Sequence, residues 1–219
     1  MKNTLFLKPG IFALLMFSFF TANSYPDLKR YEWFKGKIEL SDGTVYEGKM
    51  AFSIKDNYVI IRKGLKVKSY SPLHVNYFRF YDKNRKMIRQ FYTLPLEKES
   101  GYKSLMFFEL LVDGPITLLN REVLIKTDSP TESSAIDYLP IEENTYLRDR
   151  YYILNQDGLQ RVWNMSTEFF EFVAADLEEE MHEYKKEHNL HLLKRHHIMR
   201  MIYYYNDAAI SSELTAMNN

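Results

Sequence analysis

Residues 36–50 read GKIELSDGTVYEGKM, and the rest of the fold can be worked out from this stretch. Apolar and polar residues alternate on both sides of Ser41-Asp42-Gly43, as they do in strands with one buried face. An Asp-Gly pair between two such runs favours a tight β-hairpin. The stretch therefore predicts two antiparallel strands, and the period of two continues from Trp33 to about Asp82.

Three more short strands are expected after this hairpin, at residues 58–61, 66–70 and 75–81. The separating segments are Lys55-Asp56-Asn57, Lys63-Gly64 and Ser71-Pro72, which are all typical of turns. Five short antiparallel strands in one compact segment favour a small closed barrel, because closure removes exposed strand edges. We therefore expect a barrel at residues 33–82.

The spacing of Gly36, Ile38, Leu40, Asp42-Gly43 and Gly48 in this meander resembles that of SH3-like or Sm-like small barrels. Sm-like proteins bind RNA, but their second signature is missing here, and RNA binding is not carried over. The chain as a whole also resembles uncharacterised exported bacterial proteins with a β-rich body and a helical tail. Neither resemblance implies an activity.

Further strands are predicted in the middle of the chain, at residues 87–94, 105–112, 116–119, 151–154 and 159–163. Turns are expected at Asp113-Gly114-Pro115 and at residues 155–158, which read NQDG. Residues 126–137 are rich in Ser, Thr, Asp and Pro and predict a loop. The β-rich body is thus expected to span residues 25–165.

The hydrophobic period changes from two to that of a helix at Ser166. Phe169, Val173, Leu177 and Met181 form a stripe on one helical face, with Ser166 as the expected N-cap. After a break near Asn189, a second helix is expected at residues 190–205. The predicted class is α+β: an antiparallel β body, followed at residues 166–219 by an antiparallel helical pair packed on it.

The N-terminus predicts a signal peptide at residues 1–24. Lys2 and Lys8 precede an apolar run at Ile11–Phe20, and Ala22 and Ser24 supply the small residues of a cleavage site. The apolar run is shorter than the roughly 20 residues that a membrane-spanning helix needs. We therefore expect an exported protein, periplasmic or extracellular, with no transmembrane segment in the mature chain.

The composition restricts how such a protein is anchored and stabilised. The chain has no cysteine, so it offers neither a lipid attachment site of the bacterial lipoprotein type nor disulfides. Removing Lys2 and Lys8 leaves 27 basic against 29 acidic residues. A net charge near −2 gives no reason to expect a nucleic-acid partner.

Five of the six histidines lie between positions 182 and 197, and such a cluster raises the question of metal binding. The zinc-protease motif that begins at His182-Glu183 needs histidine at position 186, where the chain has Lys186. Glu179 and His182 match half of a di-iron motif, but such sites draw ligands from four helices. We predict no metal, no cofactor and no catalytic residue from known motifs.

The strongest local signal is a basic segment. Residues 62–89 hold nine basic residues and one acidic residue, with tyrosine and phenylalanine between them. Such a segment is able to hold an anionic partner by charge and stacking. The favoured interpretation is that the lysines protect exposed strand edges while the aromatic residues fill the barrel. The candidate ligand-binding residues are Arg62, Lys63, Lys66, Lys68, Lys83, Arg85, Lys86 and Arg89.

Two classes of function remain open on these observations. The first is a non-enzymatic binding or structural protein whose partner is an anionic glycan, a lipid head group or an acidic protein. The alternative is a hydrolase of envelope or extracellular polymers with acidic catalysts. Convergent carboxylates in a pocket would favour the hydrolase, and a basic surface without them would favour the binding protein.

Overall fold

The structure of the protein is a computed structural model that describes residues 31–98, 100–126, 145–173 and 177–217 of the 219-residue chain. Contacts divide the chain into two units, Met1–Arg30 and Tyr31–Asn219, and every described residue belongs to the second. The predicted signal peptide at residues 1–24 and most of the predicted loop at 126–137 lie outside the described residues.

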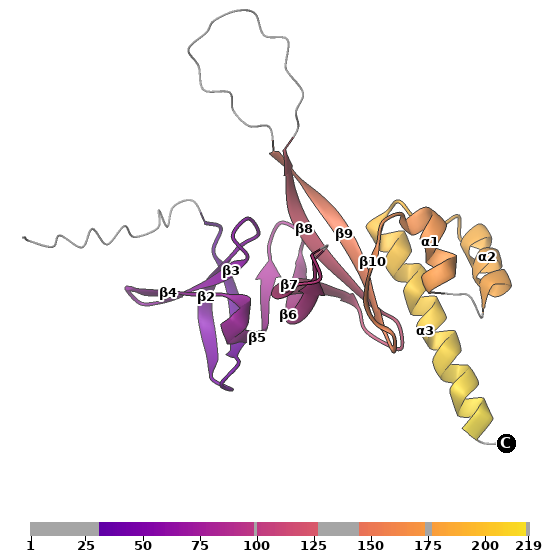
Figure 1. Cartoon of the computed structure of the whole chain (residues 1–219), viewed down its shortest axis with the longest axis horizontal. Helices are drawn as coiled ribbons and strands as arrows, with labels where there is room; N and C mark the ends of the chain where they lie inside the picture. Colours follow the sequence, from indigo (N-terminus) through magenta and orange to yellow (C-terminus); the bar gives the residue numbers. More distant parts are fainter. Residues whose placement is uncertain (1–30, 99, 127–144, 174–176, 218–219) are drawn as a thin grey trace, which may run out of the picture. The chain divides into compact units, whose positions relative to one another are not determined.

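Strands make up about half of the described chain (Figure 1). They are β1 (Phe34–Leu40), β2 (Val45–Ser53), β3 (Tyr58–Lys63), β4 (Lys66–Tyr70), β5 (Val75–Asp82), β6 (Met87–Glu97), β7 (Lys103–Val112), β8 (Thr117–Lys126), β9 (Thr145–Asn155) and β10 (Gly158–Val162). Within the described ranges these ten strands form one antiparallel sheet, in the order β10-β9-β8-β7-β6-β5-β1-β2-β3-β4. The predicted antiparallel β body is confirmed.

The predicted closure into a small barrel is wrong, because the sheet is open. The fifth strand returns to pair with β1, as Gly36 opposite Phe80 shows, after the short 3-10 helix η2 (Pro72–His74). The other edge of β5 pairs with β6. Since a strand has only two edges, β5 has none left for β4, and the sheet continues into β6 instead of closing.

The hairpin at residues 36–50 forms as its sequence predicts. Gly43 adopts a positive φ of 82°, and Ile38 pairs with Tyr46 across the hairpin. Ile38 and Leu40 point into an apolar cluster that is rich in aromatic rings, with Phe78 stacked on Phe91 at 4.6 Å between centroids. This first core stabilises the end of the sheet formed by β1–β5.

The C-terminal part contains three helices, α1 (Met165–Phe172), α2 (Glu178–Glu187) and α3 (Arg195–Met217). The prediction of a helical pair is therefore wrong. The expected first helix is divided between α1 and α2, because Leu177 has a non-helical backbone and α2 begins after it. Asn164 is the N-cap of α1, with its side chain accepting a hydrogen bond from the backbone N–H of Ser166.

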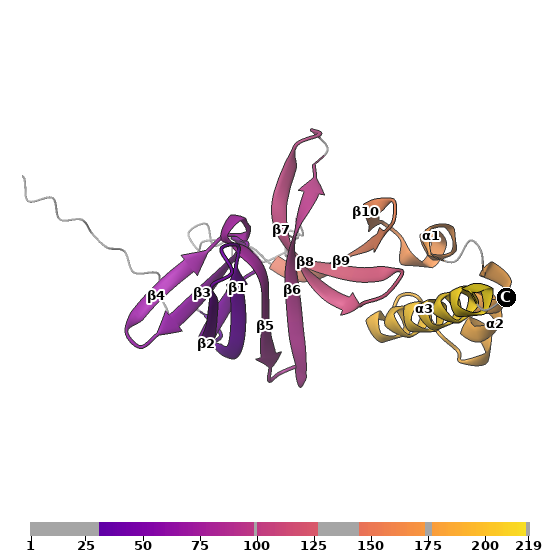
Figure 2. The same ribbon diagram turned by 90° about the horizontal axis from the view of Figure 1, so that it is seen from below.

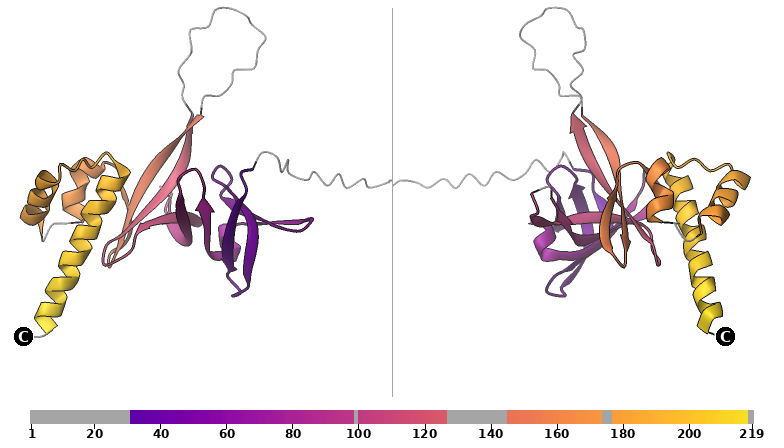
Figure 3. Two further views of the ribbon diagram at one scale, coloured as in Figure 1. Left: turned by 180° about the vertical axis from the view of Figure 1, so that it is seen from behind. Right: turned by 45° about the vertical axis from the view of Figure 1, so that its right-hand side comes forward.

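These helices pack on the β7–β10 part of the sheet, as the views in Figures 2 and 3 show. Phe169, Met181 and Ile198 are fully buried with Leu118 and Ile153 of the sheet. Asn206 of α3 fastens the turn between β7 and β8. Its Oδ1 accepts from the Ile116 N–H at 3.0 Å, and its Nδ2 donates to the carbonyls of Ile116 and Asp113.

A third, smaller cluster lies on the opposite face of the sheet. Phe108, Leu119 and Tyr152 are buried there, with Leu94, Leu96 and Leu159 packed against them. Because neighbouring residues of a strand point to opposite faces, β7, β8 and β9 contribute to this cluster and to the helix-covered core at once. The face that carries the small cluster is the one that positions the candidate site.

Candidate functional site

A groove of about 630 Å³ opens over this third cluster. It runs from the end of β6 and the turn that follows, across β8 and β9, to the end of β10. Three arginines and two aromatic side chains dominate its lining, which consists of Leu96, Glu97, Lys98, Ser100, Arg121, Arg150, Tyr152, Arg161 and Trp163. Four of these residues are cationic and one is anionic.

Two of the arginines face each other across neighbouring strands. Arg121 of β8 and Arg150 of β9 are directly opposed in an antiparallel pair, which places their Cβ atoms about 5 Å apart. Like charges in this position destabilise a sheet. No carboxylate among the described residues lies within ion-pair distance of either guanidinium. The two arginines therefore form a cationic pair that the described sheet does not neutralise.

Burial adds to the cost of this arrangement. Burial lowers the pKa of Arg121, and the neighbouring Arg150 lowers it further, whereas contact with Tyr152 raises it. Arginine stays charged in proteins despite such shifts. Groups with perturbed pKa values in a concave surface are candidates for a binding site, and an anion between the two guanidinium groups would remove their repulsion.

The floor of the groove is rigid and aromatic. Tyr152 is 2% exposed and meets Phe108 edge to face, with 5.0 Å between ring centroids. The guanidinium of Arg121 lies 5.6 Å from the centre of the Phe108 ring. These contacts hold Arg121 in one place, so little side-chain entropy is lost when it binds a ligand.

Trp163 forms one wall and is 69% exposed. The guanidinium of Arg161 stacks on the indole at 3.3 Å from its centre. The backbone N–H groups of Trp163 and Asn164 donate to the two carboxylate oxygens of Glu168, at 2.9 and 3.1 Å. The junction between β10 and α1 is thereby fixed, and an exposed ring face is presented at the end of the groove.

The carboxylates of the same strands point away from the groove. Glu122 and Asp149 are the only acidic residues in β8, β9 and β10 as the structure describes them, and they lie opposite each other on the other face. Asp149 Oδ1 accepts a hydrogen bond from Asn120 at 2.8 Å. Alternation along two strands thus separates arginines on one face from carboxylates on the other.

The carboxylate face belongs to a buried ionic network centred on Arg89. This arginine is 6% exposed and donates to both oxygens of Glu109, at 2.8 and 2.9 Å, and to Glu122 at 2.8 Å. Burial lowers the pKa of Arg89, but Glu109 and Glu122 raise it by more. Arg195, at the start of α3, reaches Glu109 at 2.9 Å. Arginines bind the carboxylates of this network, and these ion pairs connect strands and a helix of the fold.

Two of the eight residues of the predicted basic surface belong to this network. Arg89 is interior, as described above, and Arg85 contacts Glu122 and lies 3.8 Å from Asp82. The other six are exposed at two hairpins: Arg62, Lys63, Lys66 and Lys68 on β3 and β4, and Lys83 and Lys86 in the turn between β5 and β6. The structure does not bring all eight onto one surface.

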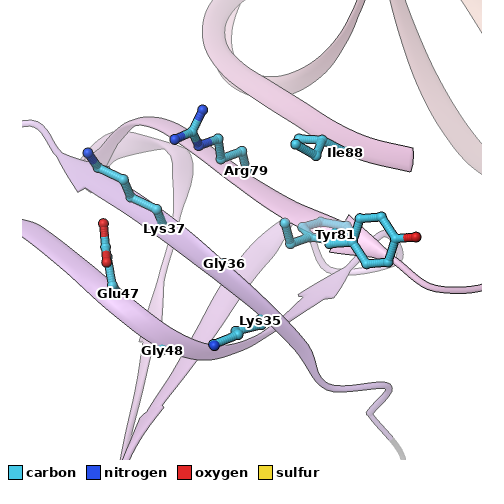
Figure 4. A pocket seen from close by; sticks show the side chains of 9 residues that line it. Lys35, Gly36, Lys37, Glu47, Gly48, Arg79, Tyr81 and Ile88 are labelled. Carbon is cyan, nitrogen blue, oxygen red and sulfur yellow. The ribbon is translucent and has the colours of Figure 1, made fainter. Parts of the chain in front are cut away.

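A smaller pocket of about 370 Å³ is lined by residues of β1, β2, β5 and β6 (Figure 4). Lys35 and Lys37 of β1 and Arg79 of β5 line it, with Glu47 of β2. Lys37 is directly opposite both Glu47 and Arg79 in the sheet. The carboxylate of Glu47 partly offsets this charge, and the arginine groove is the larger and more cationic of the two.

The histidine-rich segment has local contacts. His182 stacks on Phe170 with 3.8 Å between ring centroids, and the Nδ1 of His197 accepts from the backbone N–H of His191 at 2.8 Å. In the part of the chain that the structure covers, no three His, Asp or Glu side chains are grouped as metal ligands.

The sequence analysis missed Arg121 and Arg150 because both fall outside the expected strands at residues 116–119 and 151–154. The observed β8 continues to Lys126, and β9 begins at Thr145. A usable signal is present at residues 146–152, which read YLRDRYY. Tyr146, Arg148, Arg150 and Tyr152 alternate with Leu147, Asp149 and Tyr151. Read with a period of two, the segment predicts one basic, aromatic face.

Comparison of the chain with protein-family models, with curated proteins and with solved structures finds no match. Among the helices in the described ranges, none has the length and apolar character required to cross a bilayer. The function therefore has to be argued from the geometry of the groove.

Proposed function

We propose that the protein is a non-enzymatic binding protein that holds an anionic ligand in the arginine groove. The single observation that carries the proposal is the opposed pair Arg121 and Arg150, whose charges meet no carboxylate in the described chain. Guanidinium groups bind carboxylate or phosphate through two parallel hydrogen bonds, and these charge-assisted bonds are among the strongest available to a protein. Trp163 supplies an exposed flat ring beside them, over a floor that the buried Tyr152 helps to form.

Two features support binding over hydrolysis. Glycoside cleavage uses two carboxylates separated by roughly 5–10 Å across the scissile bond. Glu97 is the one carboxylate among the described lining residues, and it lies 3.8 Å from Lys103. The buried carboxylates Glu109 and Glu122 are held by Arg89 behind the sheet.

The test measures binding of polygalacturonate, of polyphosphate and of neutral dextran by affinity electrophoresis at two salt concentrations. The wild type should bind the acidic polymers, more weakly at the higher salt because exposed charges are screened over about 8 Å at physiological ionic strength. Arg121→Ala and Arg150→Ala should each weaken binding about tenfold or more, since a hydrogen bond to a charged group contributes about 1.5–3 kcal/mol.

The control is a double variant, Lys66→Ala with Lys68→Ala, which removes two exposed charges from β4. This double variant should bind like the wild type. Arg150→Ala should also melt no earlier than the wild type, because it relieves like-charge repulsion. Loss of binding in the β4 double variant, with both groove variants unaffected, would move the site to the basic hairpins and refute the proposal.

We also propose that the protein acts outside the cytoplasm, in the periplasm or at the cell exterior. The support is the order of basic residues, apolar run and small residues in positions 1–24. N-terminal sequencing of the protein recovered outside the cytoplasm should begin at Tyr25. An intact Met1 on that material would contradict export by this route.

We also propose that the strands of residues 33–82 have an SH3-like arrangement. Five consecutive strands that surround one apolar cluster support it, with β1 in the middle between β2 and β5. An experimental structure of the chain would test it, and strands arranged in any order other than β5-β1-β2-β3-β4 would refute it.

A further inference from the structure

We infer that the ligand of the groove is a linear acidic polysaccharide of the polyuronate class that lies along β9. This inference rests on the proposed function, because it specifies the anion that the groove binds. Three observations carry it: the cations continue beyond the groove in a row, the face they occupy is free of carboxylates in the described strands, and the exposed aromatic rings Tyr146 and Trp163 border the arginines of this row.

The row follows from the period of the strand. Arg148 and Arg150 share one face of β9 and are about 7 Å apart, at about 3.4 Å per residue. Arg148 does not line the groove, so it extends the basic surface past its rim. On the other side of Arg150, Tyr152 pairs with Arg161 of β10. A compact anion could reach one part of this row, whereas an extended polyanion can contact all of it.

The face is uniform in charge because each carboxylate of these strands points the other way. Glu122 is held by Arg89 and Arg85, and Asp149 by Asn120, on the network side of the sheet. Reorienting either carboxylate would break these hydrogen bonds and leave their donors without a carboxylate partner. The row is therefore a fixed cationic surface.

The aromatic rings favour a sugar polymer over a nucleic acid. Tyr146 is 41% exposed at one end of the row, with its ring 5.8 Å from the Arg148 guanidinium. Trp163 is 69% exposed and lies beside Arg150, because Val162 before it pairs with Tyr151. The other accessible positions of the row are Arg148 and Arg150, since Tyr152 is buried. Single-stranded nucleic acids bind through aromatic rings that stack on successive bases. Here Tyr146 is followed along the strand by the guanidinium forks of Arg148 and Arg150, which match a chain of carboxylates.

The experiment measures the affinity of the full chain for galacturonic acid oligomers by isothermal titration calorimetry. The probes are the dimer, the tetramer and the octamer, with neutral cello-oligosaccharides and an oligothymidylate of eight nucleotides as comparisons. The affinity should rise about tenfold or more from dimer to octamer, because added contacts to a connected ligand act intramolecularly. The neutral oligomers should not bind, and the oligothymidylate should bind more weakly than the octamer.

Arg148→Ala separates this inference from the proposed function. This variant should lose most of the rise in affinity from the galacturonic acid dimer to the octamer. Its affinity for the dimer should stay within about twofold of the wild-type value, since Arg148 lies outside the groove. Arg150→Ala should weaken dimer and octamer alike, and Arg62→Ala on β3 serves as the control of equal charge.

Three other results of this experiment would contradict the inference, and each can be told apart from the others. Binding that depends on Arg121 and Arg150 but does not change with oligomer length would refute the polysaccharide and leave the anion-binding function intact. Tighter binding of the oligothymidylate would assign the row to nucleic acid and also overturn the inference. Equal binding of neutral and acidic oligomers, unaffected by Arg150→Ala, would overturn both proposals.

Discussion

At the scale of single residues, the sequence places charges but does not reveal which of them are buried. The basic segment at residues 62–89 is visible from composition, yet Arg89 within it is interior and bonded to Glu109 and Glu122. Those carboxylates are 20 and 33 positions further along the chain. Pairing of this kind depends on strand order and register, which are not local properties of the sequence.

Glu122 makes the stability of the protein dependent on pH. Burial raises the pKa of Glu122, but Arg89 and Arg85 lower it by more, so the folded-state pKa lies below the ordinary value of about 4.3. A group with a lowered folded-state pKa stabilises the fold above its unfolded pKa and loses this contribution as the pH falls through the folded pKa. The unfolding free energy should therefore fall as the pH drops below about 4.3.

Glu122→Gln should reduce the unfolding free energy at pH 7 by about 1.5–3 kcal/mol, the contribution of a hydrogen bond to a charged group. It should also make the decline at acidic pH shallower. Urea denaturation at a series of pH values measures both effects. Glu97→Gln is the control, because its carboxylate is 62% exposed and pairs with Lys103 at 3.8 Å. A decline that is unchanged in Glu122→Gln would show that Glu122 does not contribute to it.

At the scale of elements, the type of structure was predictable and the boundaries were less so. The hairpin of β1 and β2 follows from local alternation and the Asp-Gly turn, which need no distant partner. The division between α1 and α2 is hidden, because Phe169, Val173 and Met181 are buried in one cluster whether or not the helix is continuous. Glu178, Glu179 and Glu180 in the first turn of α2 were the available signal, since acidic residues favour a helix start.

The third helix differs from its prediction for a similar reason. Leu190 and Leu192 lie in the predicted helix at 190–205 and are buried, but they precede α3, which begins at Arg195. The buried face of α3 carries Ile198, Met201 and Ile202. An apolar residue before a helix continues the pattern of the helix itself, so periodicity cannot separate the two.

At the scale of the whole described unit, the ionic network lies between two apolar clusters of the same sheet. One is the aromatic cluster of β1–β5, and the other is the core under the helices. Arg89 comes from β6, Glu109 from β7, Glu122 from β8 and Arg195 from α3. Separating the two clusters would leave buried charges without partners, which is strongly destabilising. We therefore expect Tyr31–Asn219 to unfold in one cooperative step.

The two tryptophans test this expectation, because Trp33 directly precedes β1 and Trp163 directly follows β10. Trp33→Phe and Trp163→Phe each leave a single fluorescent reporter, at the end of β10 in the first variant and at the start of β1 in the second. In each variant, the midpoint of thermal unfolding measured by tryptophan fluorescence should equal the midpoint measured by far-UV circular dichroism. Two separate midpoints would show that the clusters unfold independently and that the network does not couple them.

The alternation of arginines and carboxylates in β8 and β9 has an evolutionary consequence. Because side chains alternate faces with a period of two, inserting or deleting one residue within either strand moves every following side chain to the opposite face. Arg148 and Arg150 would then enter the sheet's packed side, and Asp149 would enter the groove. Lineages that retain the groove are therefore expected to change the length of these strands only by even numbers of residues. A homologue that keeps the groove with an odd change inside either strand, without a β-bulge to absorb it, would contradict this.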